Sequence, residues 1–178
     1  MIDFKEPFVN FKKNAFRLET LPEYRVDYET KLIEDYLAGK PVDYSGGEID
    51  WWLDMVSSKT SQGLTMSRVH VVSEPLTDYL RFELGAAYPI TSAAGEEIRL
   101  ISEDSFDDLC DEDEFDVVFN RWGALDFWLF DDERLFIMDY ADDGSWLGVN
   151  ESFDNEDIKD AMRIRDAVMT ESRAFFSL

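Results

Sequence analysis

Cysteine and histidine are nearly absent from this sequence, and their scarcity excludes several kinds of chemistry. The 178 residues include one cysteine, Cys110, and one histidine, His70. A single thiol cannot form an intrachain disulfide or a cysteine-based zinc site. This thiol also lies within the acidic run 107–112, whose negative charges oppose formation of the nucleophilic thiolate. We therefore interpret Cys110 as a bystander in the chemistry of the protein.

The lone histidine also bears on a possible phosphodiester-cleaving enzyme. Segment 68–72, segment 126–131 and the last helix loosely resemble a degenerate phospholipase-D-like domain. Such enzymes need paired histidines and lysines, with imidazole as nucleophile and as general acid. Here Val72 stands where the lysine would be. We interpret His70 as a packed, hydrogen-bonded strand residue and expect no activity of this kind.

Other signatures are missing as well. The sequence contains no Ser-His-Asp arrangement, no phosphate-binding glycine loop and no dinucleotide fingerprint, so we expect no cofactor and favour a non-enzymatic protein. No stretch approaches the roughly 20 apolar residues of a membrane span. The first residues, MIDFKEPFVNFKKN, lack the apolar segment and cleavage site of a signal peptide. These absences predict a cytoplasmic protein that does not enter a membrane.

Basic residues are scarce relative to acidic ones. The 17 lysines and arginines face 40 aspartates and glutamates, which gives a formal net charge of -23. Most of this excess lies in residues 101–178, which hold 23 acidic residues and 6 basic ones. Such a field repels nucleic acid and anionic membranes, and it attracts basic partners. Direct binding of nucleic acid is therefore not expected.

What the chain does contain is enough apolar material for a folded core. Hydrophobic residues make up 45% and aromatic residues 15%, which is typical of a globular protein. No linker or internal repeat divides the chain, so we predict one domain over residues 1–178. Apolar periodicity predicts helices at 4–14, 27–38, 48–61, 75–88 and 154–174. Strand patterns fall at 16–19, 66–72, 97–101 and 117–119.

Residues 126–149 predict an antiparallel meander. Three apolar segments, 126–130, 135–140 and 146–149, are separated by the acidic turns 131–133 and 142–144. Helices and a strand–helix–strand unit precede this meander, and a last helix follows it. The order predicts an α+β fold in which helices flank a mixed β-sheet with an antiparallel C-terminal meander.

Four ordered blocks carry a resemblance to a known family. They are FRLETLPEY at 16–24, PLTDYLRFE at 75–83, AGEEIR at 94–99 and DFWLFD at 126–131. Together they resemble an uncharacterised domain-of-unknown-function family common in actinomycete bacteria. The resemblance implies a small cytoplasmic protein, often encoded beside helix-turn-helix regulators, and hence a role in regulation. It brings no catalytic residues.

The acidic tract 103–116 raises the possibility of a calcium site. An EF-hand loop requires alternating acids, a central glycine and a glutamate at its twelfth position. Counted from Asp111, the tract has no glycine at the sixth position. Segment 139–144 has a glycine but lacks the later ligands. We predict no specific metal site.

Five charged residues form a candidate pocket, because they fall in segments that should be largely buried: Arg17, Arg68, Arg81, Glu83 and Arg99. A buried arginine needs a carboxylate partner, and Glu19, Glu83 and Glu97 are available. The set is either a structural ion-pair network or the lining of a pocket for an anion or a nucleotide. The second reading makes the protein a ligand-binding or enzymatic domain.

A second candidate site is a surface for a protein partner. Trp51 and Trp52 are adjacent in a predicted helix, so they cannot both face the core, and we expect one indole to be exposed. With the acidic tract, this gives a candidate partner surface of Trp51, Asp107, Asp108, Asp111 and Asp113. Our leading hypothesis is an acidic, non-enzymatic accessory protein that binds a basic partner such as a DNA-binding regulator. The alternative is the ligand-binding domain.

Overall fold

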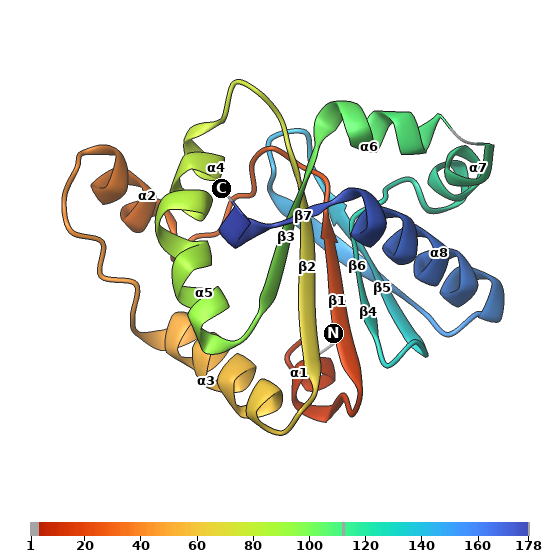
Figure 1. Ribbon diagram of the computed structural model, residues 1–178, viewed down its shortest axis with the longest axis horizontal. Helices are drawn as coiled ribbons and strands as arrows, with labels where there is room; N and C mark the ends of the chain where they lie inside the picture. The colour runs from red at the N-terminus through yellow and green to blue at the C-terminus, as the bar shows by residue number, and fades with distance from the viewer. Residues whose placement is uncertain (1–3, 112, 178) are drawn as a thin grey trace.

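The computed structural model describes residues 4–111 and 113–177, which build a mixed seven-stranded sheet with helices on both faces (Figure 1). The strand order is β6-β5-β4-β1-β2-β3-β7. The combination of helices with a mixed sheet is the predicted α+β class. None of the helices in the described ranges combines the length and apolar composition needed to cross a membrane.

The centre of the sheet is parallel. Strand β1 (Asn14–Glu19) pairs with β2 (Thr65–Val72), and β2 pairs with β3 (Glu97–Ser102). Helices α2 (Thr30–Leu37) and α3 (Gly47–Ser61) connect β1 to β2. Helix α4 (Asp78–Phe82), the π-helix η1 (Glu83–Ala87) and α5 (Tyr88–Ala94) connect β2 to β3. These crossovers place α3, α4 and α5 on one side of the sheet (Figure 1).

The predicted C-terminal meander is confirmed. Strands β4 (Phe127–Phe130), β5 (Arg134–Tyr140) and β6 (Trp146–Ser152) pair antiparallel in sequence order, and β4 joins β1. The β4–β5 turn places Asp131 and Asp132 at φ of 56° and 59°, a region that aspartate tolerates better than most residues. The carboxylate of Asp131 accepts hydrogen bonds from the backbone N–H groups of residues 12–14, which anchors the turn to the start of β1.

The acidic segment folds into two helices, α6 (Glu103–Cys110) and α7 (Asp113–Trp122). The strand predicted at 117–119 is therefore wrong. Its β-branched residues favour a strand locally, but Phe115, Val118 and Trp122 recur at helical spacing and pack on the core. Val117 and Phe119, on the other side of the helix, are exposed. Burial of this stripe outweighs the local preference.

The two faces of the sheet have separate cores. One face packs against α6, α7 and α8 (Asn155–Glu171) through a cluster that includes Phe16, Leu18 and Val168. The opposite face packs against α1 (Glu6–Asn10) and α3 through Phe8 and Trp128, among others. A short strand β7 (Arg173–Ala174) and the 3-10 turn η2 (Phe175–Ser177) end the described chain. Because side chains alternate along β1, Arg17 and Glu19 lie on the α1–α3 face.

Candidate functional site

A cleft of about 900 Å³ opens on the sheet face that carries α1, α3 and α4. Aromatic side chains form about half of its lining, and Tyr24, Tyr28, Tyr44, Tyr79 and Trp128 are among them. Its charged lining comes from Lys5, β1, β2, the segment 25–29 and η1. A volume of this size with many aromatic side chains in its walls is typical of sites for small organic molecules.

The floor of the cleft carries two arginines side by side. Arg17 on β1 and Arg68 on β2 are register partners, so both side chains rise from the same face of the sheet. Trp128, the partner of Arg17 on β4, lies beneath them, with its ring centre 5.6 Å and 6.0 Å from the two guanidinium carbons. The aromatic ring favours these cations, but two adjacent positive charges still require carboxylates.

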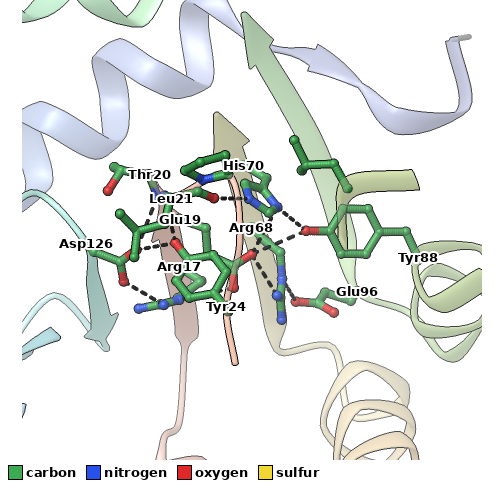
Figure 2. Close-up of polar contacts among 12 residues, drawn as sticks. Arg17, Glu19, Thr20, Leu21, Tyr24, Arg68, His70, Tyr88, Glu96 and Asp126 are labelled. Atoms are coloured by element: carbon green, nitrogen blue, oxygen red, sulfur yellow. Dashed lines mark hydrogen bonds and ion pairs between the residues drawn. The ribbon is translucent and has the colours of Figure 1, made fainter. Parts of the chain in front are cut away.

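Three buried carboxylates supply that balance (Figure 2). Glu19 lies between the arginines: its Oε2 accepts a hydrogen bond of 2.8 Å from Nη1 of Arg68, and its Oε1 is 3.6 Å from Nε of Arg17. Asp126 pairs with Nη2 of Arg17 at 2.5 Å. Glu96 accepts a hydrogen bond of 2.9 Å from Nε of Arg68. The pair of arginines is thus held by a continuous ion-pair network.

Glu19 is ionised despite its burial. Burial opposes the charged form, but the charges of Arg68 and Arg17 more than offset it and lower the pKa of Glu19 to about 2. Asp126 behaves differently, because burial outweighs its contact with Arg17 and raises its pKa. The hydroxyl of Tyr24 also donates to Asp126, which fixes the chain after β1 over the network.

His70 is fully buried and both of its ring nitrogens are engaged (Figure 2). Nε2 lies 3.0 Å from the carbonyl of Leu21, so it donates there. Nδ1 lies 2.5 Å from the hydroxyl of Tyr88 and accepts from it in the neutral ring. Burial lowers the pKa of His70, which favours that neutral form. The imidazole is a structural link between β2, the segment after β1 and α5.

A second group of acidic residues lines the cleft. Glu29 and Glu83 line it and are buried, with exposed fractions of 6% and 4%. Burial raises the pKa of Glu29 to about 7; Arg68 opposes this shift and Glu19 adds to it. Burial, with the neighbouring charge of Glu29, raises the pKa of Glu83 well above its usual value. These two carboxyl groups therefore resist ionisation, whereas Glu19 on the floor of the cleft is ionised.

Two polar atoms in the cleft lack hydrogen-bond partners among the described residues. They are Nη1 of Arg17 and Oε2 of Glu29. Both residues are more than nine-tenths buried and both line the cleft. Because buried polar atoms in native proteins are nearly always hydrogen-bonded, these atoms mark where a bound molecule would find its partners.

The structure separates the five residues of the sequence-predicted pocket. Arg17, Arg68 and Glu83 line the cleft. Arg81 is exposed on α4, with its Nη1 3.7 Å from Asp78. Arg99 lies on the opposite face of β3, where it donates to the carbonyls of Met169 and Ser172 and ties β3 to the end of α8. These last two arginines are no part of the cleft.

The residues of the predicted partner surface also lie apart. Asp107, Asp108 and Asp111 are exposed on and just after α6, on the α8 face of the sheet. Trp51 is half-buried on the other face, where it packs on Phe8 and lines the cleft. Asp113 begins α7, and its side chain is outside the described part of the chain. The indole and the acidic tract do not form one surface.

A smaller hollow of about 490 Å³ lies between α7 and α8. Arg121 there pairs with Asp157 at 3.1 Å and with Asp160, so its polar groups have partners. Across residues 4–111 and 113–177, no group of three histidine, cysteine, aspartate or glutamate side chains is arranged to hold a metal ion. The cleft is the stronger candidate site.

Comparison with known proteins identifies a family whose description states no function. The model of a family described as a domain of unknown function (DUF6879) matches residues 2–176, almost the whole chain. No curated protein matches the chain.

Proposed function

The chain belongs to the DUF6879 family of domains of unknown function, and we propose that it is a binding domain for a small organic molecule with a flat apolar part. The resemblance predicted from the sequence is confirmed at the level of an uncharacterised family. Its occurrence in actinomycetes, its neighbouring regulators and a cytoplasmic location stay predictions. The proposal therefore depends on the cleft itself.

The observation that carries the proposal is the pair of unpartnered polar atoms at the bottom of an aromatic cleft. Nη1 of Arg17 and Oε2 of Glu29 are buried without partners among the residues described. Leaving such atoms unsatisfied costs roughly 1–3 kcal/mol each, or more for charged groups. A ligand that bonds to them and stacks on the aromatic walls would recover this free energy.

Binding is favoured over catalysis by the state of the most obvious catalytic group. His70 is neutral and uses both nitrogens in hydrogen bonds within the protein, so it is not free to exchange a proton with a bound molecule. Cys110 lies on α6, away from the cleft, and burial raises the pKa of its thiol to about 11. These observations support a site that recognises its ligand without transforming it.

The test is a fragment screen by ligand-observed NMR, followed by matched variants. Tyr28, which lines the cleft, and Phe119, which lies on α7, are both 49% exposed, so removing either ring disturbs the core little. We expect Tyr28→Ala to weaken binding of aromatic fragments by about tenfold, the scale of one lost stacking contact of ~1–1.5 kcal/mol. Phe119→Ala should leave binding unchanged. Fragments that bind both variants as tightly as the wild type would refute a ligand site in the cleft.

A second function, association with a basic protein, is supported by the exposed acids of α6. Asp107, Asp108 and Asp111 face solvent, and no ion pair to these three appears within the described residues. A basic surface such as that of a DNA-binding regulator complements this charge. This function uses the face opposite the cleft, so the two proposals do not compete for the same residues.

A further inference from the structure

The two guanidinium groups on the cleft floor are already neutralised. Arg17 is bound by Asp126 and Glu19, and Arg68 is bound by Glu19 and Glu96. Three carboxylates therefore surround two cations before any ligand enters. Carboxylates outnumber cations on this floor, so it offers little attraction to an anionic ligand and favours a neutral or cationic one.

Glu29 and Glu83 make no ion pair within residues 4–111 and 113–177. Glu29 is held in place by its backbone: its N–H donates to the carbonyl of Val26, and its own carbonyl accepts from the N–H of Ile33, the first bond of α2. The side chain is buried at the cleft, with Oε2 unpartnered. A buried carboxyl group without a partner is stabilised by a positive charge or a hydrogen-bond donor, and a ligand could supply either.

The π-helix η1 brings the second carboxyl group to the same end of the cleft. Glu83 is its first residue, and Glu83 and Ala87 are the buried residues of this wide turn that line the cleft. Glu83 is close enough to Glu29 for the charge of Glu29 to raise its pKa further. π-Turns of this kind occur frequently at functional sites.

Tyrosine rings surround these two carboxyl groups. Tyr28, Tyr44 and Tyr79 all line the cleft, and burial followed by the charge of Glu29 or Glu83 raises the pKa of each hydroxyl. The negative faces of aromatic rings attract cations, most strongly where water is excluded. No group of three histidine, cysteine, aspartate or glutamate side chains among the described residues is arranged to hold a metal ion here.

We propose that the ligand of the cleft carries an organic ammonium group, which binds Glu29 and Glu83 within the tyrosine corner while its apolar part lies over Trp128. The inference rests on the proposed function of the cleft as a ligand site. The ammonium group supplies the cation that neither carboxyl group has, and it donates to Oε2 of Glu29. The open Nη1 of Arg17 then recognises a neutral acceptor on the same molecule.

Binding of such a ligand should depend on pH. The groups that face Glu29 are Arg68 on β2, Glu19 on β1, Glu83 on η1 and the hydroxyls of three tyrosines, Tyr28, Tyr44 and Tyr79. Because the pKa of Glu29 is about 7, its carboxyl group is mostly protonated in mild acid and becomes an anion as the pH rises. The affinity for an ammonium ion should therefore increase as the pH rises through about 7.

Three probes of similar size separate the contribution of the ligand's charge from that of its phenyl ring: 2-phenylethylamine, 2-phenylethanol and phenylacetate. Calorimetry should show the amine binding the wild type about tenfold more tightly than the alcohol at about pH 8, with phenylacetate weakest, and this preference should shrink at about pH 5.5. Glu29→Gln should abolish the preference without changing the affinity for the alcohol. Glu34→Gln, an exposed change on the same helix, is the matched control and should preserve it.

The outcomes distinguish the inference from the proposed function. Equal affinities for amine and alcohol, or a preference that survives both Glu29→Gln and Glu83→Gln, would overturn the ammonium assignment and leave the cleft as a ligand site. No binding of any probe to the wild type would overturn both. Glu83→Gln is the second carboxyl variant and tests the same assignment independently. A thermal melt shows whether each variant is folded.

Discussion

Glu19 and Glu29 show how two buried carboxyl groups in one cleft take opposite ionisation behaviour. Both are at most 6% exposed. Glu19 contacts Arg68 and Arg17, and its pKa falls to about 2. Glu29 has the charge of Arg68 nearby but no ion pair in the described chain, and its pKa rises to about 7. Partners, and not burial alone, decide where the cleft carries negative charge.

Glu29→Gln should stabilise the protein in alkaline solution. The folded pKa of about 7 exceeds the ordinary value of 4.5, so the folded state binds more protons than the unfolded state between these values. Glu29 therefore destabilises the fold increasingly as the pH rises through this window. In urea unfolding we expect the variant to exceed the wild type by about 1–3 kcal/mol at about pH 8 and to match it near pH 4.

Glu34→Gln is the control for that measurement, because Glu34 is exposed on the same helix. It should show no such pH-dependent difference from the wild type. A Glu29→Gln variant that is less stable than the wild type at alkaline pH would mean that the carboxylate has a stabilising partner, and it would contradict the assignment of an unpaired group.

The sequence predicted part of the site at the level of residues. Arg17 and Arg68 stood out as cations in apolar strands, and both lie on the cleft floor. Arg99 has the same pattern, but it pairs with Val69 and so faces α8. The alternation of side chains divides a strand into two faces. It does not tell which of these faces shares a side of the sheet with a given face of the neighbouring strand, because that depends on the register. Glu29 was missed because its burial depends on where α2 packs.

At the level of elements, the helix predicted at 75–88 is interrupted. The structure has α4, the π-turn η1 and α5 in succession, and α4 begins after Thr77 instead of at residue 75. The hydroxyl of Thr77 accepts a hydrogen bond from the N–H of Leu80 and donates to the carbonyl of Pro22. Apolar spacing identified the helical region, but the extra residue of a π-turn has no periodic signature that would reveal it.

Thr77→Ala should destabilise the protein by about 1 kcal/mol, the usual cost of losing a helix cap. The change removes the cap of α4 and its bond to the segment after β1, both of which position Tyr79 and Glu83. Thr170→Ala on α8 removes an exposed hydroxyl that bonds only within its own helix, to Asp166, and should change stability by less than about 0.5 kcal/mol. Equal effects of the two changes in thermal or urea unfolding would show that the Thr77 cap of α4 does not contribute specifically to the stability of the fold.

Over the whole molecule, charge and cleft lie on opposite sides of the sheet. The acidic helix α6 packs with α7 and α8 on one face (Figure 1). The cleft opens on the other face. The net charge of -23 projects a negative potential toward any approaching basic surface. Association on the α6 face could therefore proceed with the cleft filled or empty.

The triple variant Asp107→Asn/Asp108→Asn/Asp111→Asn should associate more slowly with a lysine-rich peptide. Long-range attraction raises the association rate, and salt screens it over a Debye length of about 8 Å at physiological ionic strength. Stopped-flow measurements should show an association rate that is several-fold lower than wild type at low salt and less dependent on salt. An association rate identical to the wild type across the salt range would mean that this tract serves solubility alone. Glu156→Gln, at the exposed start of α8, is a single-charge control.

Four of the five tryptophans, Trp51, Trp52, Trp128 and Trp146, border the cleft, and Trp122 packs on Phe127 on the other face of the sheet. Most of the ultraviolet emission of the protein therefore originates from indoles that an occupant of the cleft would touch or shield from water. The wavelength and intensity of this tryptophan fluorescence should therefore change when the cleft is occupied. The change can be used to detect binding of the natural ligand from cell extracts without an attached dye.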